Sequence, residues 1–576
     1  MPGRSRLRQY IFSLLLIAVV LLFVIYPLFY IIEGSLWVGG EGEKTLSVAL
    51  FRQLFANPAI RLSLWNSLKL ALITTALTAL LTTPLAFFST HYDFRGKNLF
   101  AGLLLVPIVL PPFVGALGVQ QFFARFGSFN IILERLGLIS GPIDWLAGGG
   151  FWGVVILQVL HLYPIMYLNV CAGLGAVDPA MEEAARNLGA SGWRVLRTVT
   201  LPLAWPGYFA GAAITFIWSF TDLGTPLIFQ YRQVAAVHIF DKIKDIHSNP
   251  IGYALVLTVL LISGLVFASA KATVGGRGYQ MMARGHLETR RKPRSIWGHA
   301  GIIVFFGAVI FAALLPHIGV VLTSVSRRWL MTALPSEFTT ESFEKLFQHT
   351  LTANSIRQSL WLSGLSMIVD VILGGAIAYF LVRGTVRGRA FLDALVMLPL
   401  AIPGLVLAFG YLNAFAGSGL DRFTTNWLGL PLNPRLNPGP LLVIAYAIRR
   451  LPLMVRAAYA GFQSSSETLE EASYNLGAGS WTTLRRVTIP LTSASLIAGA
   501  VLCFAFSMLE VSDSLILALE ERFYPITKAI YSLSMRVGDG PAVACALGVI
   551  GMVLLATALI AAGALLGRRM GSLFRV

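Results

Sequence analysis

Residues 182–202 read EEAARNLGASGWRVLRTVTLP, and residues 470–490 read EEASYNLGAGSWTTLRRVTIP. The second stretch lies 288 positions after the first, and thirteen of the 21 aligned residues are identical. The identical pairs are spread over the stretch and include Glu182/Glu470, Glu183/Glu471, Ala184/Ala472, Gly189/Gly477 and Pro202/Pro490. A polar segment that occurs twice in the same register indicates that the chain is built from two copies of one unit.

The repeat extends well beyond these two segments. Asn66-Ser67 matches Asn354-Ser355, and Pro164 matches Pro452, at the same offset of 288. At an offset of 292, R-G-K at 95–97 and L-V-P-I-V-L-P at 105–111 match R-G-R at 387–389 and M-L-P-L-A-I-P at 397–403. We therefore predict three parts: a first unit at 1–274 with its polar motif at 178–202, a basic linker at 275–297, and a second unit at 298–576 with its motif at 466–490.

The composition identifies the class of protein. Hydrophobic residues make up 56% of the 576 positions and charged residues 12%, and the mean hydropathy is +0.74. These values exclude a soluble globular protein. A membrane-spanning helix needs about 20 mostly apolar residues, and twelve segments qualify: 10–32, 66–88, 99–118, 151–174, 203–223, 251–271, 301–324, 359–382, 391–415, 439–462, 493–516 and 541–566. We expect an all-α polytopic membrane protein of two six-helix repeats.

The distribution of charge predicts the orientation. With a cytoplasmic N-terminus, the inner segments hold 23 Lys and Arg against 8 Asp and Glu, whereas the outer loops hold 17 against 14. This asymmetry follows the positive-inside rule and places both motifs and both termini on the cytoplasmic side of the membrane. Six spans return the chain to its starting side, so the two halves run parallel. Because the basic residues flank spans and form no patch interleaved with aromatic residues, nucleic-acid binding is not expected.

Each motif predicts a helix, a glycine elbow and a second short helix. Asp178 and Ser466 are good N-caps, and the two glutamates of each copy then fall near the first turn, where the helix dipole favours negative charge. Gly189 and Gly477 can adopt the positive φ that ends the first helix. A capped connector between two spans would explain one such copy, but not the retention of the whole pattern in both.

The pattern E-A-A-x3-G-x9-[IV]-x-[LI]-P resembles the cytoplasmic coupling loop of type I ABC importer permeases, and departs from it at Ser473. The resemblance implies that the glutamates, Ala184, Ala472, the glycines, Pro202 and Pro490 form levers gripped by a cytoplasmic ABC ATPase dimer. It also implies a location in a bacterial inner membrane, a periplasmic or lipid-anchored substrate-binding protein, one copy of this chain per complex, and transport by alternating access.

We expect no enzyme activity and no bound cofactor in the chain itself. A phosphate-binding loop needs G-x4-G-K-[ST], and the nearest segment, G-E-K-T at 42–45, has Glu43 at the position of the second glycine. Cys171, Cys503 and Cys545 have no metal-ligand spacing, so no metal site is expected. ATP and magnesium should be bound by the partner ATPase.

Five charged residues inside spans are candidates for the translocation pathway, because charge within the membrane is costly and usually functional. Asp222 and Glu510 occupy equivalent positions near the outer ends of two spans, where they would form an acidic outer gate. Asp370, Arg449 and Arg450 lie at the middle of spans, and His161 is equivalent to Arg449. The alternative is mutual neutralisation, for example of Asp370 by Arg449.

The substrate is less well defined. D-L-G-T-P at 222–226 and R-R-L-P-L at 449–453 resemble ferric iron importers most, and the same group includes permeases for 2-aminoethylphosphonate, polyamines, thiamine and sulfate. The carboxylates suit a cation, whereas Arg449 and Arg450 suit a phosphonate. A secondary transporter, which also consists of two six-span repeats, is the alternative from a different class.

Overall fold

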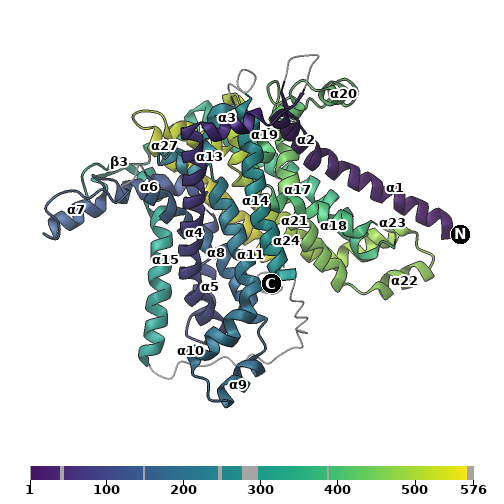
Figure 1. Cartoon of the computed structure of the whole chain (residues 1–576), viewed down its shortest axis with the longest axis horizontal. Coiled ribbons are helices and arrows are strands. Elements are labelled where there is room, and N and C mark those ends of the chain that lie inside the picture. The colour runs from purple at the N-terminus through teal and green to yellow at the C-terminus, as the bar shows by residue number, and fades with distance from the viewer. Residues whose placement is uncertain are drawn as a thin grey trace.

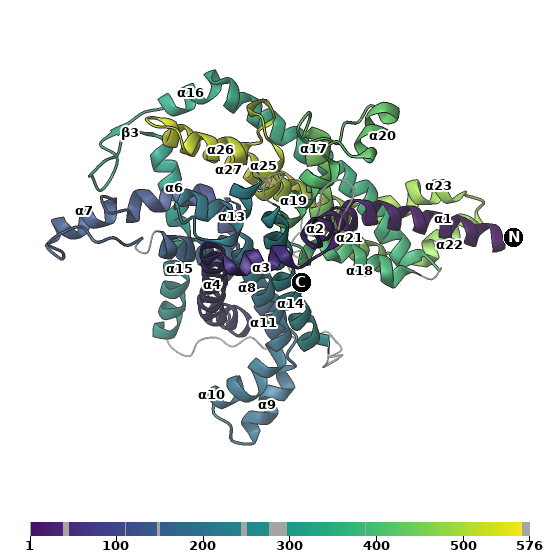
Figure 2. The same cartoon turned by 45° about the horizontal axis from the view of Figure 1, so that its top comes forward.

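The computed structural model describes residues 2–38, 45–109, 111–146, 150–243, 250–275, 296–385 and 388–566. These residues form a long assembly of helices, with α7 (Ser128–Arg135) extending to one side and α1 (Pro2–Val20) to the other (Figures 1 and 2). The linker predicted at 275–297 lies outside the described residues except at its two ends, and so does the C-terminal segment 567–576.

The first half contains the helices and short strands that follow α1 as far as the linker. In chain order these are η1 (Leu21–Ile25), α2 (Tyr26–Leu36), β1 (Trp37–Val38), β2 (Thr45–Leu46), α3 (Ala49–Ala56), α4 (Pro58–His91), α5 (Lys97–Leu103), η2 (Val106–Val109), α6 (Pro112–Phe123), α7, α8 (Phe151–Gly175), α9 (Pro179–Asn187), α10 (Gly192–Val195), η3 (Leu196–Thr200), α11 (Leu201–Thr221), α12 (Gly224–Ile228), α13 (Ala235–Lys242) and α14 (Ile251–Gly275).

The second half repeats this order. Its elements are α15 (Ile296–Ser324), β3 (Ser326–Arg328), β4 (Glu337–Phe338), α16 (Glu341–Gln348), α17 (Thr350–Arg383), α18 (Arg389–Ala401), α19 (Gly404–Phe415), α20 (Gly419–Leu428), α21 (Gly439–Ser464), α22 (Glu467–Asn475), α23 (Ser480–Thr483), η4 (Leu484–Thr488), α24 (Ile489–Met508), α25 (Ser512–Leu517), η5 (Glu521–Phe523), α26 (Ile526–Ser534) and α27 (Gly540–Leu566). β1 pairs with β2, and β3 with β4, as antiparallel hairpins.

Each half is built around three mutually packed helices, α4, α8 and α11 in the first and α17, α21 and α24 in the second. The two longest, α4 and α17, both have 34 residues. The Asn57 side chain caps α4 by accepting from the backbone N–H of Ala59 at 3.0 Å, and His349 caps α17 by accepting from Leu351 at 3.3 Å. A polar residue at the N-cap satisfies donors that the first turn leaves unpaired.

The structure corrects one match of the repeat. Ser67 accepts a hydrogen bond from the backbone N–H of Ala235 at 2.8 Å, and the residue that makes the same bond in the second half is Ser359, which accepts from Ile526 at 2.7 Å. Ser67 therefore corresponds to Ser359, at an offset of 292, although Asn66 and Asn354 make the same kind of bond at an offset of 288: each side-chain amide donates to a backbone carbonyl, that of Gln233 or Arg522. The identical Asn-Ser dipeptides lie one helical turn apart in the two helices.

The twelve predicted spans fall into three groups. Among the described residues, nine helices are long and apolar enough to cross a membrane, or up to eleven if each of two bent pairs is one span. The bent pairs are the predicted spans 99–118 and 391–415, which turn by 97° and 103° at breaks that contain proline. Proline lacks a backbone donor and so interrupts a helix. The remaining predicted span, α21, is not among these helices; it has 26 residues and carries Arg449, Arg450 and Arg456.

The two halves exchange their first helices. α15 of the second half packs on α6 of the first, and α2 of the first half packs on α19 of the second. At the first contact the backbones almost touch: a Cβ atom on Gly118 would lie 2.3 Å from the carbonyl oxygen of Pro316. Next to the second, the Tyr411 hydroxyl of α19 donates to the carbonyl of Phe23 in η1 at 2.7 Å. One hydrophobic core consequently runs through both halves.

Candidate functional site

The first polar motif folds as a helical elbow at the end of α8. Asp178 caps α9, its carboxylate accepting from the N–H of Ala180 at 2.9 Å. Gly189 has φ +83° and ends the helix as predicted. Ser191 caps α10 by accepting from Arg194 at 3.4 Å. α10 is not a separate helix, because the π-helical turn η3 joins it to α11 just before Pro202.

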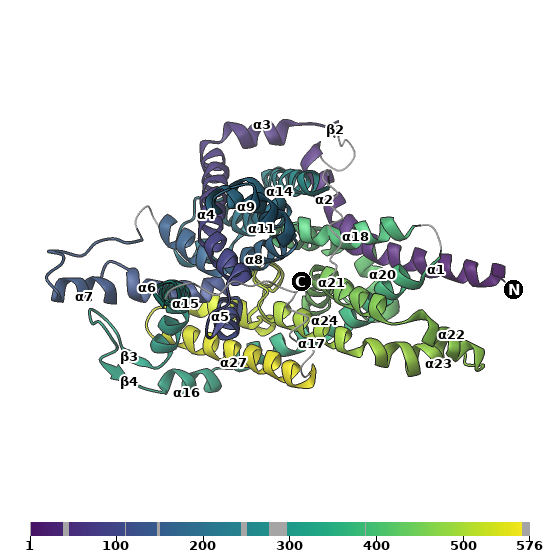
Figure 3. The same cartoon turned by 90° about the horizontal axis from the view of Figure 1, so that it is seen from below.

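The second motif forms the same elbow with weaker capping. Gly477 has φ +84°, and η4 joins α23 to α24 just before Pro490. Ser466 stands at the N-cap position of α22, but its hydroxyl lies 2.5 Å from that of Thr468 and makes no capping bond. The two elbows project separately, α9 and α10 at the bottom of Figure 1 and α22 and α23 at its lower right. Figure 3 shows the same separation from below.

Each elbow presents the same large apolar side chains to solvent. Leu188 and Trp193 are 89% and 70% exposed, and their counterparts Leu476 and Trp481 are 88% and 71% exposed. Glu183, Ala184, Glu471 and Ala472 are also exposed. Because exposed apolar groups outside a membrane are costly unless something covers them, the repeated pair indicates a docking surface on each elbow.

The first glutamate of each motif is buried and fastens the elbow to the rest of its half. Glu182 is 3.2 Å from Nε2 of His91, the last residue of α4, and accepts from the Thr200 hydroxyl at 2.6 Å. The hydrogen bond with His91 holds the pKa of Glu182 below its usual value. Glu470 accepts from Nε of Arg383, the last residue of α17, at 3.3 Å.

Neither His91 nor Arg383 was predicted from the sequence as a partner of these glutamates. His91 and Arg383 are equivalent at the offset of 292 that the R-G-K and R-G-R segments establish. They differ in residue type, so identity between the copies could not reveal them. Their position at the ends of equivalent helices was the available signal.

A cavity of about 180 Å³ lies between the two halves, beside the breaks in the bent spans. Four of the five predicted pathway residues line it, and Asp370 does not. Its ionisable lining residues come from α8, α21 and the segments that follow α11 and α24: His161, Asp222, Arg449, Arg450 and Glu510.

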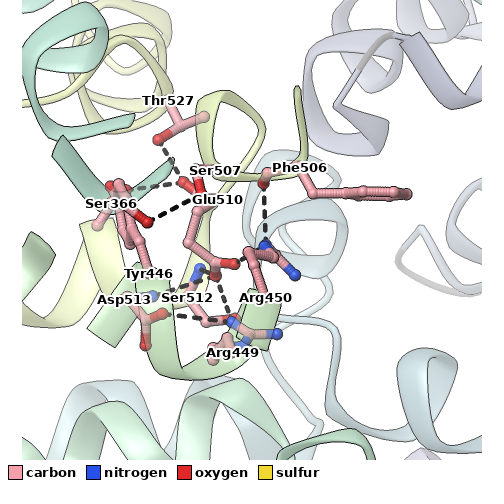
Figure 4. A network of polar contacts seen from close by, with 11 residues as sticks. Ser366, Tyr446, Arg449, Arg450, Phe506, Ser507, Glu510, Ser512, Asp513 and Thr527 are labelled. Carbon is pink, nitrogen blue, oxygen red and sulfur yellow. Dashed lines mark hydrogen bonds and ion pairs between the residues drawn. The ribbon is translucent and has the colours of Figure 1, made fainter. Parts of the chain in front are cut away.

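The charges on the second-half side of the cavity neutralise one another (Figure 4). Glu510 pairs with Nη1 of Arg449 at 2.5 Å and also with Nη2 of Arg450. Arg449 lies 3.5 Å from the Asp513 carboxylate, and Arg450 donates to the carbonyl of Phe506 at 2.9 Å. Mutual neutralisation therefore holds for Glu510, Arg449 and Arg450.

The expected pairing of Asp370 with Arg449 is wrong. Asp370 is completely buried in α17, and its carboxylate oxygens have no hydrogen-bond partner among the described residues. Arg449 instead reaches the carboxylates that follow α24, because the chain turns there and brings Glu510 and Asp513 toward α21. Asp513, which the sequence analysis did not single out, completes the charged group.

The wall of the cavity that the first half forms has one carboxylate, that of Asp222, with uncharged hydrogen-bond donors around it. Asp222 accepts from Nε2 of Gln158 at 3.0 Å and from the N–H of Gly224 at 3.1 Å, and within the described ranges it forms no ion pair. At an offset of 288, Leu162 stands where the second half has Arg450, and Thr225 where it has Asp513. Asp222 is thus a carboxylate at the cavity wall that has no ion-pair partner among the described residues.

Comparison with known proteins identifies the family. The sequence model of the binding-protein-dependent transport system inner membrane component matches the chain twice, over residues 82–275 and 370–571. A putative ferric transport system permease of Haemophilus influenzae is 26% identical over 89% of this chain and 78% of its own length. The ferric transport system permease of Actinobacillus pleuropneumoniae is 26% identical over 86% of this chain and 70% of its own.

A shorter relative matches one part of the chain. The molybdenum transport system permease of Escherichia coli is 31% identical over 29% of this chain and 71% of its own length. Together with the two family matches, which lie one in each structural half, this agrees with a fusion of two permease units. The chain belongs to the family of binding-protein-dependent transport system inner membrane components and contains the family's domain twice.

Proposed function

We propose that this chain is the membrane subunit of an ATP-driven, binding-protein-dependent importer of ferric iron. The observation that carries the proposal is the pair of equivalent elbows, each ending in an exposed leucine and tryptophan. Membership of the permease family supports the same function and leaves the secondary-transporter alternative without support. The twelve-span topology, the domain boundaries at 274 and 298 and the cytoplasmic termini belong to this proposal.

The partner of the elbows is a cytoplasmic ATPase dimer, which binds ATP and magnesium. Leu188 and Trp193 on one elbow, and Leu476 and Trp481 on the other, supply similar apolar anchors of the kind that dominate protein interfaces. One copy of the chain therefore offers one docking surface to each ATPase subunit. A substrate-binding protein delivers the cargo to the opposite face.

Transport proceeds by alternating access. Closure of the ATPase dimer around ATP draws the elbows together and opens the path between the halves to the outside, and hydrolysis returns it to the inside. The exchange of α2 and α15 between the halves supports this scheme, because movement of either half is passed to the other through packed helices.

The charges around the cavity favour a cation over a phosphonate. Arg449 and Arg450 are neutralised by the carboxylates of Glu510 and Asp513, so they are not free to bind an anion. Asp222 has no such neutralising partner in the described part of the chain. Two ferric transport permeases among the relatives agree with this choice.

The decisive experiment uses the permease reconstituted with its ATPase in liposomes. We expect that a binding protein loaded with ferric iron stimulates ATP hydrolysis and delivers iron to the lumen. The same assay with a 2-aminoethylphosphonate-binding protein is the control for the alternative substrate. Stimulation by the phosphonate system alone would overturn the assignment of iron, and failure of any ATPase to bind would overturn the importer itself.

A further inference from the structure

A groove of about 1230 Å³ lies in the second half, between α17, α21 and the segment that joins α20 to α21. This volume exceeds the roughly 300 to 1,000 Å³ of sites for small molecules. From Arg357 to Val369 the wall formed by α17 covers about 18 Å of helix, at about 1.5 Å per residue. That length is close to the depth of one leaflet, since the hydrocarbon layer of a membrane is about 30 Å thick.

The groove is open because a glycine stands where the first half has an aromatic residue. Phe151 is the first residue of α8 and Gly439 the first of α21, at the offset of 288 that relates these helices. Nζ of Lys69 lies 5.1 Å from the centre of the Phe151 ring, and the Tyr231 ring packs on it at 5.7 Å between centroids. Three packed side chains thus occupy this position in the first half.

The second half keeps aromatic residues around the same position. At the offset of 292 that relates α4 to α17, Lys69 is replaced by Trp361, which is 64% exposed and lines the groove. The segment between α25 and α26 supplies Phe523 to the lining, as the segment between α12 and α13 supplies Tyr231 to the first-half cluster. The second half therefore has the walls of the cluster without the ring at its centre.

The charge of the groove is concentrated at one end. Among the described residues that line it, Arg357 alone is charged; its side chain is exposed and forms no ion pair within the described ranges. Asn354 and Gln358 beside it donate to the carbonyl of Arg522 at 2.6 and 3.3 Å, so their amides are already engaged. Toward Val369 the lining residues of α17 are hydrophobic.

The level of Arg357 in the bundle fits the head groups of one leaflet. The 34 residues of α17 extend over about 51 Å, so a hydrocarbon layer of about 30 Å centred on the helix begins near Arg357. This is the end of α17 away from Arg383 and the second elbow, and α20 lies at the top of Figure 1, opposite the elbows. Arginine suits phosphate through paired N–H donors, and tryptophan is enriched at this level of a membrane.

We propose that the groove binds one phospholipid of the outer leaflet, with its phosphate on Arg357 and an acyl chain between α17 and α21. At the equivalent position of the first half, Phe151 takes the place of the acyl chain. The choice of leaflet rests on the proposed function, which puts the elbows in the cytoplasm. Retention of the lipid is a property of the permease itself.

The test is native mass spectrometry of the purified full-length permease after incubation with phosphatidylglycerol. We expect wild type to retain one lipid molecule, and G439F and V443F to retain it at least about tenfold less, because displacing two methylene groups from the groove already has that effect. Val443 lines the groove one helical turn after Gly439, so two variants obstruct it from separate positions.

G364F is the matched control for these variants. Gly364 also lies on α17, faces open space and is not part of the groove lining, so the same added ring should leave lipid retention as in wild type. Equal retention in wild type, G439F and V443F would overturn the proposal. A peptide that is retained in place of the lipid would also overturn it, by showing that a partner's membrane segment occupies the groove.

The position of the phosphate is tested with a second lipid. Diacylglycerol with the same acyl chains lacks the phosphate, and wild type should retain it about tenfold less than phosphatidylglycerol, because the charge-assisted hydrogen bonds are lost. R357Q should retain both lipids equally. A preference for phosphatidylglycerol that persists in R357Q would refute the role of Arg357. If the lipid binds as expected but no ATPase binds the permease, the proposed function fails and the lipid site stands.

Discussion

At the scale of single residues, the two sides of the central cavity use carboxylates differently. Glu510 is 4% exposed and shares its charge between Arg449 and Arg450, whereas Asp222 receives hydrogen bonds from an amide and a backbone N–H. A buried ion is tolerated where an opposite charge compensates it. Glu510 therefore stabilises the second half, and Asp222 is the candidate to meet a substrate.

We expect Glu510→Gln to destabilise the protein by about 3 to 5 kcal/mol, since it leaves the buried Arg450 without its counter-charge and leaves Arg449 with Asp513 alone. The thermal unfolding of detergent-solubilised protein, followed by intrinsic fluorescence, measures this. Asp222→Asn is the control at the equivalent position and should unfold near the wild-type temperature. Similar losses in both variants would contradict the unequal roles of the two carboxylates.

Asp222→Asn should instead lower ferric iron uptake by about tenfold at unchanged expression, a loss of about 1.4 kcal/mol in the stabilisation of bound cation. Radioactive iron uptake into proteoliposomes is the readout. Asp370→Asn provides the comparison, because Asp370 lies outside the cavity and its carboxylate has no hydrogen-bond partner among the residues that the structure describes. If the Asp222→Asn variant took up iron at the wild-type rate, Asp222 would not belong to the translocation pathway.

At the scale of elements, each elbow is one stiff piece with a single sharp bend. The bend is the glycine at φ +83° or +84°, and the second limb is continuous with the following span through a π-helical turn. A side chain at such a φ is strained, most of all when it is β-branched. The position of the apolar tip therefore depends on one glycine in each elbow.

We predict that Gly189→Val with Gly477→Val uncouples ATP hydrolysis from transport while the protein still inserts in the membrane. The strain is about 1 to 3 kcal/mol at each site, enough to displace the tips. Iron uptake and ATPase activity are measured on the same reconstituted complex. Gly192→Ala with Gly479→Ala is the matched control, because both glycines lie in the same elbows, have ordinary φ and face open space.

Loss of membrane insertion together with loss of transport would contradict the coupling interpretation. That outcome would support the alternative that each motif is only a capped connector between two spans.

At the scale of the whole molecule, the halves are joined by exchanged helices as well as by the linker. The contact of α15 with α6 depends on the absence of side chains at Gly118 and Gly319, whose backbones meet. Gly118→Leu should destabilise the protein by about 1 to 3 kcal/mol or more, because backbone cannot move aside as a side chain can. Thermal unfolding measures the loss.

Gly307→Leu is the control for this substitution, since Gly307 lies on the same α15 and faces open space. An unfolding temperature of Gly118→Leu equal to that of Gly307→Leu would show that the close contact between the halves does not contribute to stability.

The sequence alone determined the membrane class, the duplication and the elbows. These features depend on local chemistry: apolar runs long enough to span the membrane, capping residues, and glycines where a positive φ is needed. Asp178, Gly189 and Gly477 fulfil their predicted roles because their conformations depend on neighbours in the chain. Ser466 does not make its predicted cap, because its hydroxyl meets Thr468.

Only the tertiary structure decided which charges meet. Arg449 pairs with Glu510 rather than Asp370, and Glu182 with His91, across separations of 61 and 91 residues. Such pairings depend on how spans bend and where helices end, and the bends between 108 and 112 and between 401 and 404 are marked in the sequence by proline but not by hydropathy, so the direction of each bend is not predicted. Local sequence fixes the elements, but the balance of charge at a buried site is a property of the assembled bundle, since it depends on distances between segments remote in the chain.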